Sequence, residues 1–178
     1  MRKVLFLFGQ LNDDDVEWML TVGTRRVVPA GGVVIQQGVP VDAVFILLEG
    51  KLAVWLKGRN GERELARLNA GEIVGEMSFV DARPPSATVK ALEDSMVFAL
   101  SKAVLTRKLA ADSGFAARFY RALAIYLSTT VRERHRDLGT GVGTDEEDDV
   151  DELDPNVLDG IYLAGERFDR MVKRVMVS

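Results

Sequence analysis

The stretch Val74–Ala91 reads Val-Gly-Glu-Met-Ser-Phe-Val-Asp-Ala-Arg-Pro-Pro-Ser-Ala-Thr-Val-Lys-Ala. A glycine follows an apolar run and opens a short helix-compatible segment, two prolines then turn the chain, and an alternating strand pattern follows. A short helix that begins against a sheet is a candidate anion site, because its first N–H groups have no partners inside the helix and its dipole favours negative charge there. The stretch therefore predicts a fold and a binding pocket together.

Short strands separated by glycine turns are expected on both sides of this stretch. Asn60-Gly61, the strongest short hairpin signal, joins two of them. Many short strands at even spacing are typical of a sandwich, so the sequence predicts a mainly β fold with flanking α-helices, a jelly roll or double-stranded β-helix. The expected strands are residues 24–28, 33–35, 43–48, 51–57, 64–69, 86–92 and 95–100.

One helix is predicted before the strands. Residues 1–8 form an apolar lead-in, and the helix itself is expected over residues 10–21. Asn12, Asp13, Asp14 and Asp15 supply an N-cap and acidic side chains for its first turn, where the helix dipole favours negative charge.

Two helices are predicted after the last strand. Ser101 is the expected N-cap of a hinge helix that ends at Ala110, and Ser113 that of a long helix to about Arg136. The long helix carries an apolar residue at every fourth position, which indicates a core face or a dimer seam. These residues are Phe115, Phe119, Leu123, Leu127 and Val131.

The composition changes sharply after the long helix. Residues 139–155 are expected to be an acidic flexible linker, because a run of like charges repels itself and stays solvated. A calcium-binding loop is the alternative, but its glycine-centred ligand spacing is missing. Asp154-Pro155 then begins an amphipathic helix over residues 156–178, with aspartate as N-cap and proline at the first helical position. The predicted organisation is a domain over residues 1–138, the linker, and the C-terminal helix.

Composition limits the classes of function. The chain of 178 residues has no cysteine, a single histidine (His135) and a formal net charge of −4. The lack of cysteine rules out disulfides and thiolate metal sites and fits a reducing, cytoplasmic location. An acidic chain is not expected to bind nucleic acid, and no apolar run approaches the ~20 residues of a membrane span. No catalytic triad, metal triad or phosphate-binding Walker loop is present, so no enzyme is predicted.

Residues 5–137 resemble the cyclic nucleotide-binding domain family, of the type in catabolite activator protein and protein kinase A regulatory subunits. The resemblance implies a jelly roll followed by a hinge helix and a long C-terminal helix. No helix-turn-helix pattern follows the long helix, so a transcription factor of the catabolite-activator type is not expected. The matching residues keep the family's order and spacing: Gly32, Gly38, Phe45–Gly50, Gly71, Gly75-Glu76 and Ser86–Val89.

The resemblance implies a pocket for cyclic AMP or cyclic GMP and no metal. In the family, backbone N–H groups of this stretch and an arginine hold the cyclic phosphate, a glutamate accepts a hydrogen bond from the ribose, and the long helix covers the base. Ser128 and Thr129, beside Thr130, are the expected base contacts. The expected pocket residues are Gly75, Glu76, Met77, Ser78, Arg83, Ser86 and Ala87.

Several of these residues have a structural alternative. Glu76 is either the ribose ligand or a cap of its own short helix, and Arg83 is either a phosphate ligand or a solvated loop residue. The hydroxyls of Ser128 and Thr129 either meet a base edge or bond back to a helix carbonyl.

The sequence departs from the family at the phosphate arginine. The family places that arginine nine residues after the glutamate, and this position is Pro85, which has neither a charge nor an N–H. Arg83 lies two residues earlier. Weakening the interactions with the phosphate by about 3 kcal/mol lowers affinity roughly 100-fold.

Two functions follow from these observations. The first is a regulatory, sensory module that binds cyclic nucleotides weakly or not at all and relays occupancy through its helices. The second is a degenerate domain that serves as a protein-interaction or dimerisation unit. In either case the expected macromolecular partner is a second copy or another protein, held by the long helix and the helix over residues 156–178.

Overall fold

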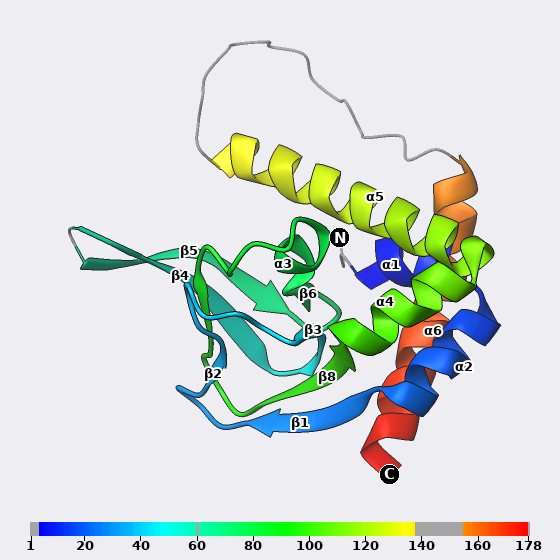
Figure 1. The fold of residues 1–178 in the computed structure, drawn as a ribbon, viewed down its shortest axis with the longest axis horizontal. Coiled ribbons are helices and arrows are strands. Elements are labelled where there is room, and N and C mark those ends of the chain that lie inside the picture. Colours follow the sequence, from blue (N-terminus) through cyan, green and yellow to red (C-terminus); the bar gives the residue numbers. More distant parts are fainter. Residues whose placement is uncertain (1–3, 60, 138–154, 178) are drawn as a thin grey trace.

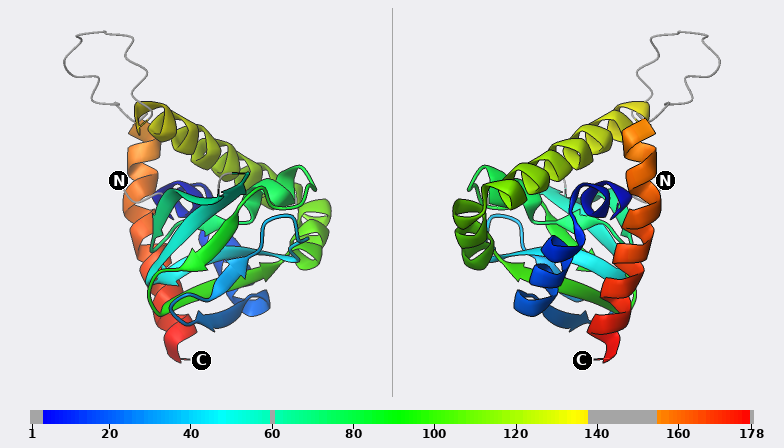
Figure 2. Two further views of the ribbon diagram at one scale, coloured as in Figure 1. Left: turned by 90° about the vertical axis from the view of Figure 1, so that its left-hand side faces the viewer. Right: turned by 90° about the vertical axis from the view of Figure 1, so that its right-hand side faces the viewer.

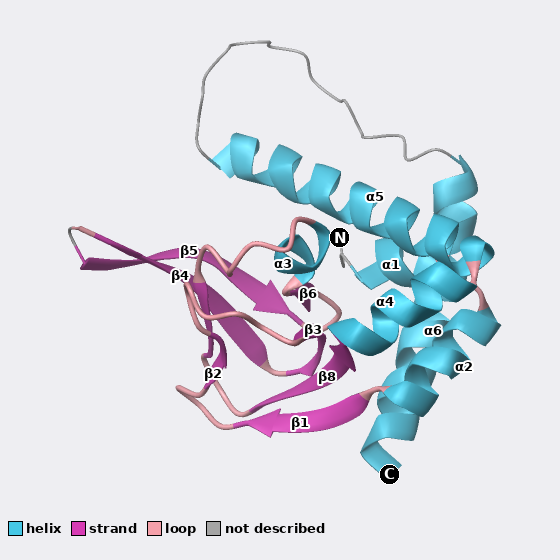
Figure 3. Ribbon diagram, viewed as in Figure 1, coloured by secondary structure: helices cyan, strands magenta, loops and turns pink. Residues whose placement is uncertain are grey.

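The computed structural model describes residues 4–59, 61–137 and 155–177, with side chains from Leu7 to Arg132 and from Leu163 to Val177 within those ranges. Two antiparallel four-stranded sheets face each other, and helices cover the outer side of one of them (Figure 1). The strands gather on one side of the molecule and most of the helices on the other (Figure 3). The predicted mainly β sandwich with flanking helices is confirmed.

The eight strands divide equally between the sheets. The first sheet has the order β1 (Thr24–Val28), β8 (Ser95–Ser101), β3 (Ala43–Glu49), β6 (Ile73–Val74). The second has the order β2 (Val33–Ile35), β7 (Thr88–Ala91), β4 (Lys51–Gly58), β5 (Gly61–Asn69). β4 and β5 form the predicted hairpin, with Gly58 opposite Gly61 at its end, while Asn60 lies outside the described residues.

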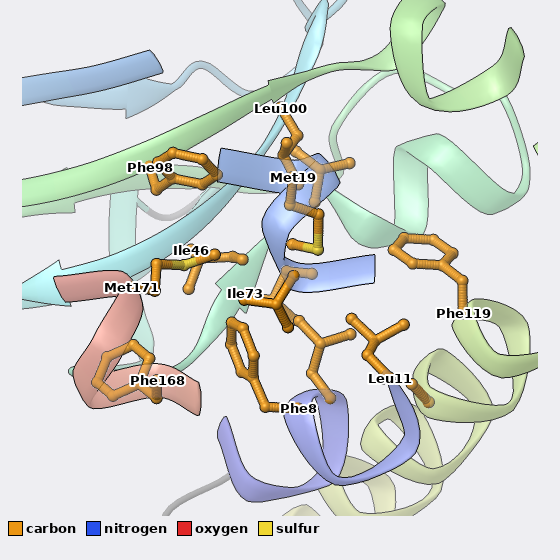
Figure 4. Packing of buried hydrophobic residues seen from close by; sticks show 14 of the residues in the cluster. Phe8, Leu11, Met19, Ile46, Ile73, Phe98, Leu100, Phe119, Phe168 and Met171 are labelled. Atoms are coloured by element: carbon orange, nitrogen blue, oxygen red, sulfur yellow. The ribbon is translucent and has the colours of Figure 1, made fainter. Parts of the chain in front are cut away.

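β3 is the central strand of the core, because both of its faces are covered. Alternate side chains of a strand point to opposite faces, so Phe45 and Leu47 face the second sheet while Ile46 and Leu48 face the helices. Residues 43–48 are all buried for this reason. The region between sheet and helices is shown in Figure 4, where Ile46 and Phe98 meet Phe8, Met19 and Met171.

Six helices are described. α3 (Glu76–Val80) is the short helix of the cassette, by which we mean residues 75–87. α4 (Lys102–Ala111) and α5 (Ser113–Asp137) match the predicted hinge and long helices within one residue at each end. The others are α1 (Val4–Gln10), α2 (Asp13–Val22) and α6 (Pro155–Val177).

Four local predictions are wrong, each for a physical reason. The single N-terminal helix is two helices, because Asn12 forms a capping box with Asp15 and starts a new helix at Asp13. Asp112, not Ser113, caps α5, since its Oδ1 accepts the N–H of Phe115 at 2.9 Å.

The other two differences concern strand ends. β5 begins at Gly61 instead of residue 64, because a bulge at Leu65 lets the pairing with β4 continue to the hairpin end. β7 begins at Thr88 instead of residue 86, because the loop set by Pro84 and Pro85 runs on through Ala87.

α6 folds back onto the helices that precede the sandwich (Figure 2). Phe168 and Met171 of the predicted apolar stripe are buried, and Phe168 packs against Phe8 with ring centroids 5.9 Å apart. The guanidinium of Arg167 donates to the carbonyls of Phe8 (2.9 Å) and Leu11 (2.7 Å). The acidic run and the predicted cap Asp154 lie outside the described residues, so the three-part organisation stays a prediction.

Candidate functional site

A cavity of about 330 Å³ lies where the second sheet, β6, the cassette and α5 meet. Its volume is within the range of small-molecule sites. Apolar residues make most of the lining, with two charged residues and several hydroxyls among them. The lining comprises Ile35, Val54, Leu65, Ala66, Arg67, Leu68, Ile73, Val74, Gly75, Glu76, Met77, Ser78, Pro85, Ser86, Ala87, Val89, Tyr126 and Thr130.

Gly75 gives the cassette its shape. Its φ is +85°, a left-handed conformation that disfavours side chains. A Cβ at this position would also lie 3.0 Å from the carbonyl oxygen of Ala43. Glycine therefore allows the chain to leave β6, pass close to β3 and begin α3 immediately, which brings Glu76 and Ser78 to the cavity.

The loop after α3 directs Pro85 toward the cavity and Arg83 toward solvent. Pro85 is buried, lines the cavity, and accepts a hydrogen bond from the N–H of Gly38 through its carbonyl at 2.8 Å. The side chain of Arg83 is 84% exposed and its Nε lies 3.9 Å from the carboxylate of Asp81. Ala82, just before Arg83, has a positive φ of 57°. The loop thus presents a proline ring to the cavity and an arginine to solvent.

Six of the predicted pocket residues do line the cavity: Gly75, Glu76, Met77, Ser78, Ser86 and Ala87. Arg83 does not. Met77 lies at the rim, since its side chain is 55% exposed. Of the residues expected near a base, Ser128 and Thr129 are not in the lining, whereas their neighbour Thr130 is.

Tyr126 is one of the lining residues that the sequence did not predict for the site. Its hydroxyl is buried and donates to the carbonyl of Ile73 at 2.9 Å, so it joins α5 to β6 at the cavity wall. Its backbone carbonyl accepts from the hydroxyl of Thr130 at 2.9 Å. Helical spacing was the available signal: Tyr126 and Thr130 are one turn apart and share a face with Phe119 and Leu123.

α3 is also tied to α5 by an aromatic contact. Phe79 meets Phe119 edge to face, with ring centroids 6.0 Å apart. Since the ring of Phe119 is buried in the core cluster of helices and sheet, the cassette rests on the same helix that closes the cavity. The cassette, which forms part of the cavity wall, is therefore in direct contact with α5.

The charges around the cavity are sparse. Glu76 and Arg67 are the charged residues of its described lining. The side chain of Arg67 is 70% exposed, and its Nε bonds a carboxylate oxygen of Glu64 at 2.7 Å. At the far end of the cassette, burial lowers the pKa of Lys102, and the nearby carboxylates of Asp42 and Asp81 oppose that shift.

The described residues contain neither a candidate metal site nor a candidate membrane-spanning helix. In that part of the chain no three or more His, Cys, Asp or Glu side chains gather to hold a metal ion. None of the described helices has the length and apolar character needed to cross a bilayer.

Comparison with known proteins agrees with this geometry. Residues 25–112 match the family model of the cyclic nucleotide-binding domain. The chain is 36% identical over 95 residues to the cyclic AMP receptor protein of Thermus thermophilus, covering 53% of this chain and 44% of that protein. It is 29% identical over 136 residues to the cAMP-dependent protein kinase regulatory subunit of Blastocladiella emersonii, covering 74% and 34%. The chain thus spans less than half the length of either relative.

Solved structures share the fold over most of the chain. A cyclic nucleotide-binding domain from Methylobacillus flagellatus superposes with a TM-score of 0.71 at 23% identity, over 81% of this chain and 85% of that chain. The catabolite activator protein of Thermus thermophilus gives 0.61 at 25% identity, over 96% and 86%. Residues 25–112 therefore agree with the family in sequence and the fold agrees in space, and the chain contains a domain of the cyclic nucleotide-binding domain family.

Proposed function

We propose that this chain is a regulatory module that has kept the pocket of its family but binds cyclic AMP and cyclic GMP weakly or not at all. Its relatives include a cyclic AMP receptor protein and a cAMP-dependent protein kinase regulatory subunit, which supports a regulatory role. The contacts of Tyr126 and Phe79 with the cavity wall and α5 support a relay from pocket to helix.

The observation that carries the proposal is Pro85 in the cavity wall. The family's phosphate arginine is expected at this position, and the proline that replaces it is buried. Arg83 is held on the solvent side, where its backbone N–H donates to Asp81 Oδ1 at 3.0 Å. Because neither position offers a guanidinium to the phosphate, we expect dissociation constants for cyclic AMP of about 0.1 mM or weaker.

Calorimetric titration with cyclic AMP and cyclic GMP tests this function. The wild-type chain is expected to bind neither nucleotide with a dissociation constant below about 0.1 mM. Pro85→Arg is expected to lower the dissociation constant for cyclic AMP by roughly 10-fold or more. Arg83→Ala is the matched control, and its affinity should equal that of the wild type. A micromolar dissociation constant for the wild type contradicts the proposal, and so does a loss of affinity in the control.

A second function, dimerisation, is favoured by a second apolar face on α5. Phe115, Phe119 and Leu123 face the core, yet another set of residues at alternating three- and four-residue steps lies on a different side of the helix and is exposed, except for Leu127, which also packs partly against the core. This spacing is the seam pattern of two packed helices, and its alanines permit close approach. The set comprises Ala117, Tyr120 (49% exposed), Ala124, Leu127 (half-buried) and Val131 (51% exposed).

We propose that a second copy of this chain packs on that face. Light scattering across a concentration series is expected to show a dimer for the wild type. Ala124→Glu is expected to shift it to monomer, because the seam would bury a charge. Ala103→Glu, on the exposed side of α4, makes the same chemical change away from the seam and should leave the dimer intact. If the wild type is a monomer at all concentrations, the dimerisation proposal is contradicted.

We also propose that the chain has no catalytic activity, no nucleic-acid partner and no membrane partner, and that it is cytoplasmic, a location supported by the lack of cysteine. A partner protein held by α6 is less favoured than a second copy, because the apolar side of α6 is already covered within the chain.

A further inference from the structure

The chemistry of the cavity indicates a particular class of ligand, and this step rests on the function proposed above. The residues of β2, β5 and β7 that form its floor are apolar: Ile35, Leu68 and Val89. Pro85 and Ala87 continue the apolar wall on the cassette side. A ligand that fills the cavity therefore needs an apolar body.

The register of the second sheet directs the guanidinium of Arg67 away from the cavity. Leu68 pairs with Leu52 in the core between the sheets, so its neighbour Arg67 takes the opposite face. On that face Arg67 pairs with Ala53 of β4, and Ala53 also pairs with Lys90 of β7. Lys90 points outward, and its Nζ lies over the ring of Trp55. Arg67 therefore contributes only to the edge of the cavity, and its charged guanidinium points away from the cavity interior.

Ser78 is a polar residue in the cavity lining. Only 8% of the residue is exposed. Its hydroxyl makes no hydrogen bond within the described residues, yet it is not among their fully buried unpaired polar atoms, so its oxygen is accessible from the cavity and can bond a ligand hydroxyl or amide. Glu76, two residues before it, lines the same cavity and brings a carboxylate, which accepts hydrogen bonds and disfavours a second anion.

We propose that the cavity takes an uncharged nucleoside in preference to its cyclic phosphate, with Ser78 and Glu76 bonding its hydroxyls and the apolar wall covering its base. A nucleoside combines the required parts, namely hydroxyl donors at one end and an apolar aromatic ring at the other. Among described lining residues, none offers a cation to the interior that would balance a phosphate. Ser78 then contributes to nucleoside affinity through its side chain.

Calorimetry with adenosine and cyclic AMP on the full chain tests this inference, because the two compounds share base and ribose and differ in the phosphate. Adenosine is expected to bind at least about 10-fold more tightly. Ser78→Ala is expected to weaken adenosine roughly 5-fold because it removes one hydrogen bond, and Ser128→Ala, outside the cavity, should change nothing. Glu76→Gln should reduce the preference for adenosine over cyclic AMP. Far-ultraviolet circular dichroism confirms that each variant is folded.

The outcomes separate the two proposals. If neither compound binds at millimolar concentration, the ligand inference is overturned while the weak-binding function stands. If cyclic AMP binds in the micromolar range and more tightly than adenosine, both are overturned. If adenosine binds but Ser78→Ala leaves its affinity unchanged, the assignment of Ser78 is overturned.

Discussion

The two ends of α5 lie in contrasting surroundings. Near its start, Phe115 and Phe119 are fully buried among α1, α2 and the first sheet. In its second half the helix passes the cavity, whose cassette wall is more exposed: Arg83 is 84% exposed, and Met77 and Val80 are each more than half exposed. We refer to the first region as the helical layer (α1, α2, α6 and the first half of α5).

The difference shows where folding free energy and binding specificity reside. Burial of apolar surface is the dominant favourable term in folding. The helical layer therefore provides most of the folding free energy that the helices contribute. The cassette exposes Met77, Val80 and Arg83, so we expect substitutions of its exposed residues to change stability less than those in the helical layer. Substitutions in the two regions should therefore have effects of different size and kind.

Met171→Ala in the helical layer is expected to give the largest effect. Met171 lies on the inner side of α6 and is completely buried (Figure 4), and removing such a side chain leaves a cavity that costs about 3 kcal/mol of unfolding free energy. Chemical denaturation measures the change. Leu163→Ala, on the same helix but 47% exposed, should cost less than about 1 kcal/mol. Equal costs for the two would mean that α6 is not docked as described.

Arg118→Ala is expected to follow, at about 2.5 kcal/mol. Its guanidinium donates to both oxygens of Asp15 at 2.7 and 2.8 Å, and the carboxylate of Asp15 is only 4% exposed. Removal of the arginine leaves that carboxylate buried without its main partner. Urea titration gives the value, and Arg121→Ala on the exposed face of α5 serves as control. A cost near zero would show that solvent replaces the ion pair.

Most of the fold was predictable because local signals agreed with one another. The glycine turns, the hairpin at Asn60-Gly61 and the continuous apolar run over residues 43–48 all point to the same sandwich. The split between α1 and α2 was missed because Asn12 and its acidic neighbours were assigned to a first turn without separating them from the apolar residues before it. The bulge at Leu65 was missed because register depends on the partner strand, which a single segment does not show.

The site was predictable where it is made of consecutive residues and less so where separate elements meet. Gly75 to Ser78 reach the cavity because the glycine fixes the direction of the chain. On α5, Ser128 and Thr129 were expected and Tyr126 was not, because the rotation of a helix against its neighbours follows from packing. The hydroxyl of Tyr126 is fixed by Ile73, 53 positions earlier in the sequence.

Gly75→Ala tests the cassette and is expected to cost about 2 kcal/mol. Two terms contribute, the left-handed φ of +85° and the contact of 3.0 Å with the carbonyl oxygen of Ala43. Gly38→Ala is the control, because its φ is +75° and nothing lies within 4 Å of the added Cβ, so it should cost about 1 kcal/mol. Thermal unfolding of both variants separates the steric term. A cost for Gly75→Ala no larger than that of Gly38→Ala would show that β3 yields at this point.

Tyr126→Phe acts where the two regions meet and is expected to have the smallest effect on stability, about 1 kcal/mol. The substitution keeps the buried ring and removes one hydrogen bond to the carbonyl of Ile73. Chemical denaturation checks the stability, and Tyr120→Phe on the exposed face is the matched control. Because the removed bond joins α5 to the cavity wall, ligand affinity should change more in Tyr126→Phe than in the control. Equal affinities would mean that α5 closes the cavity through its packing alone.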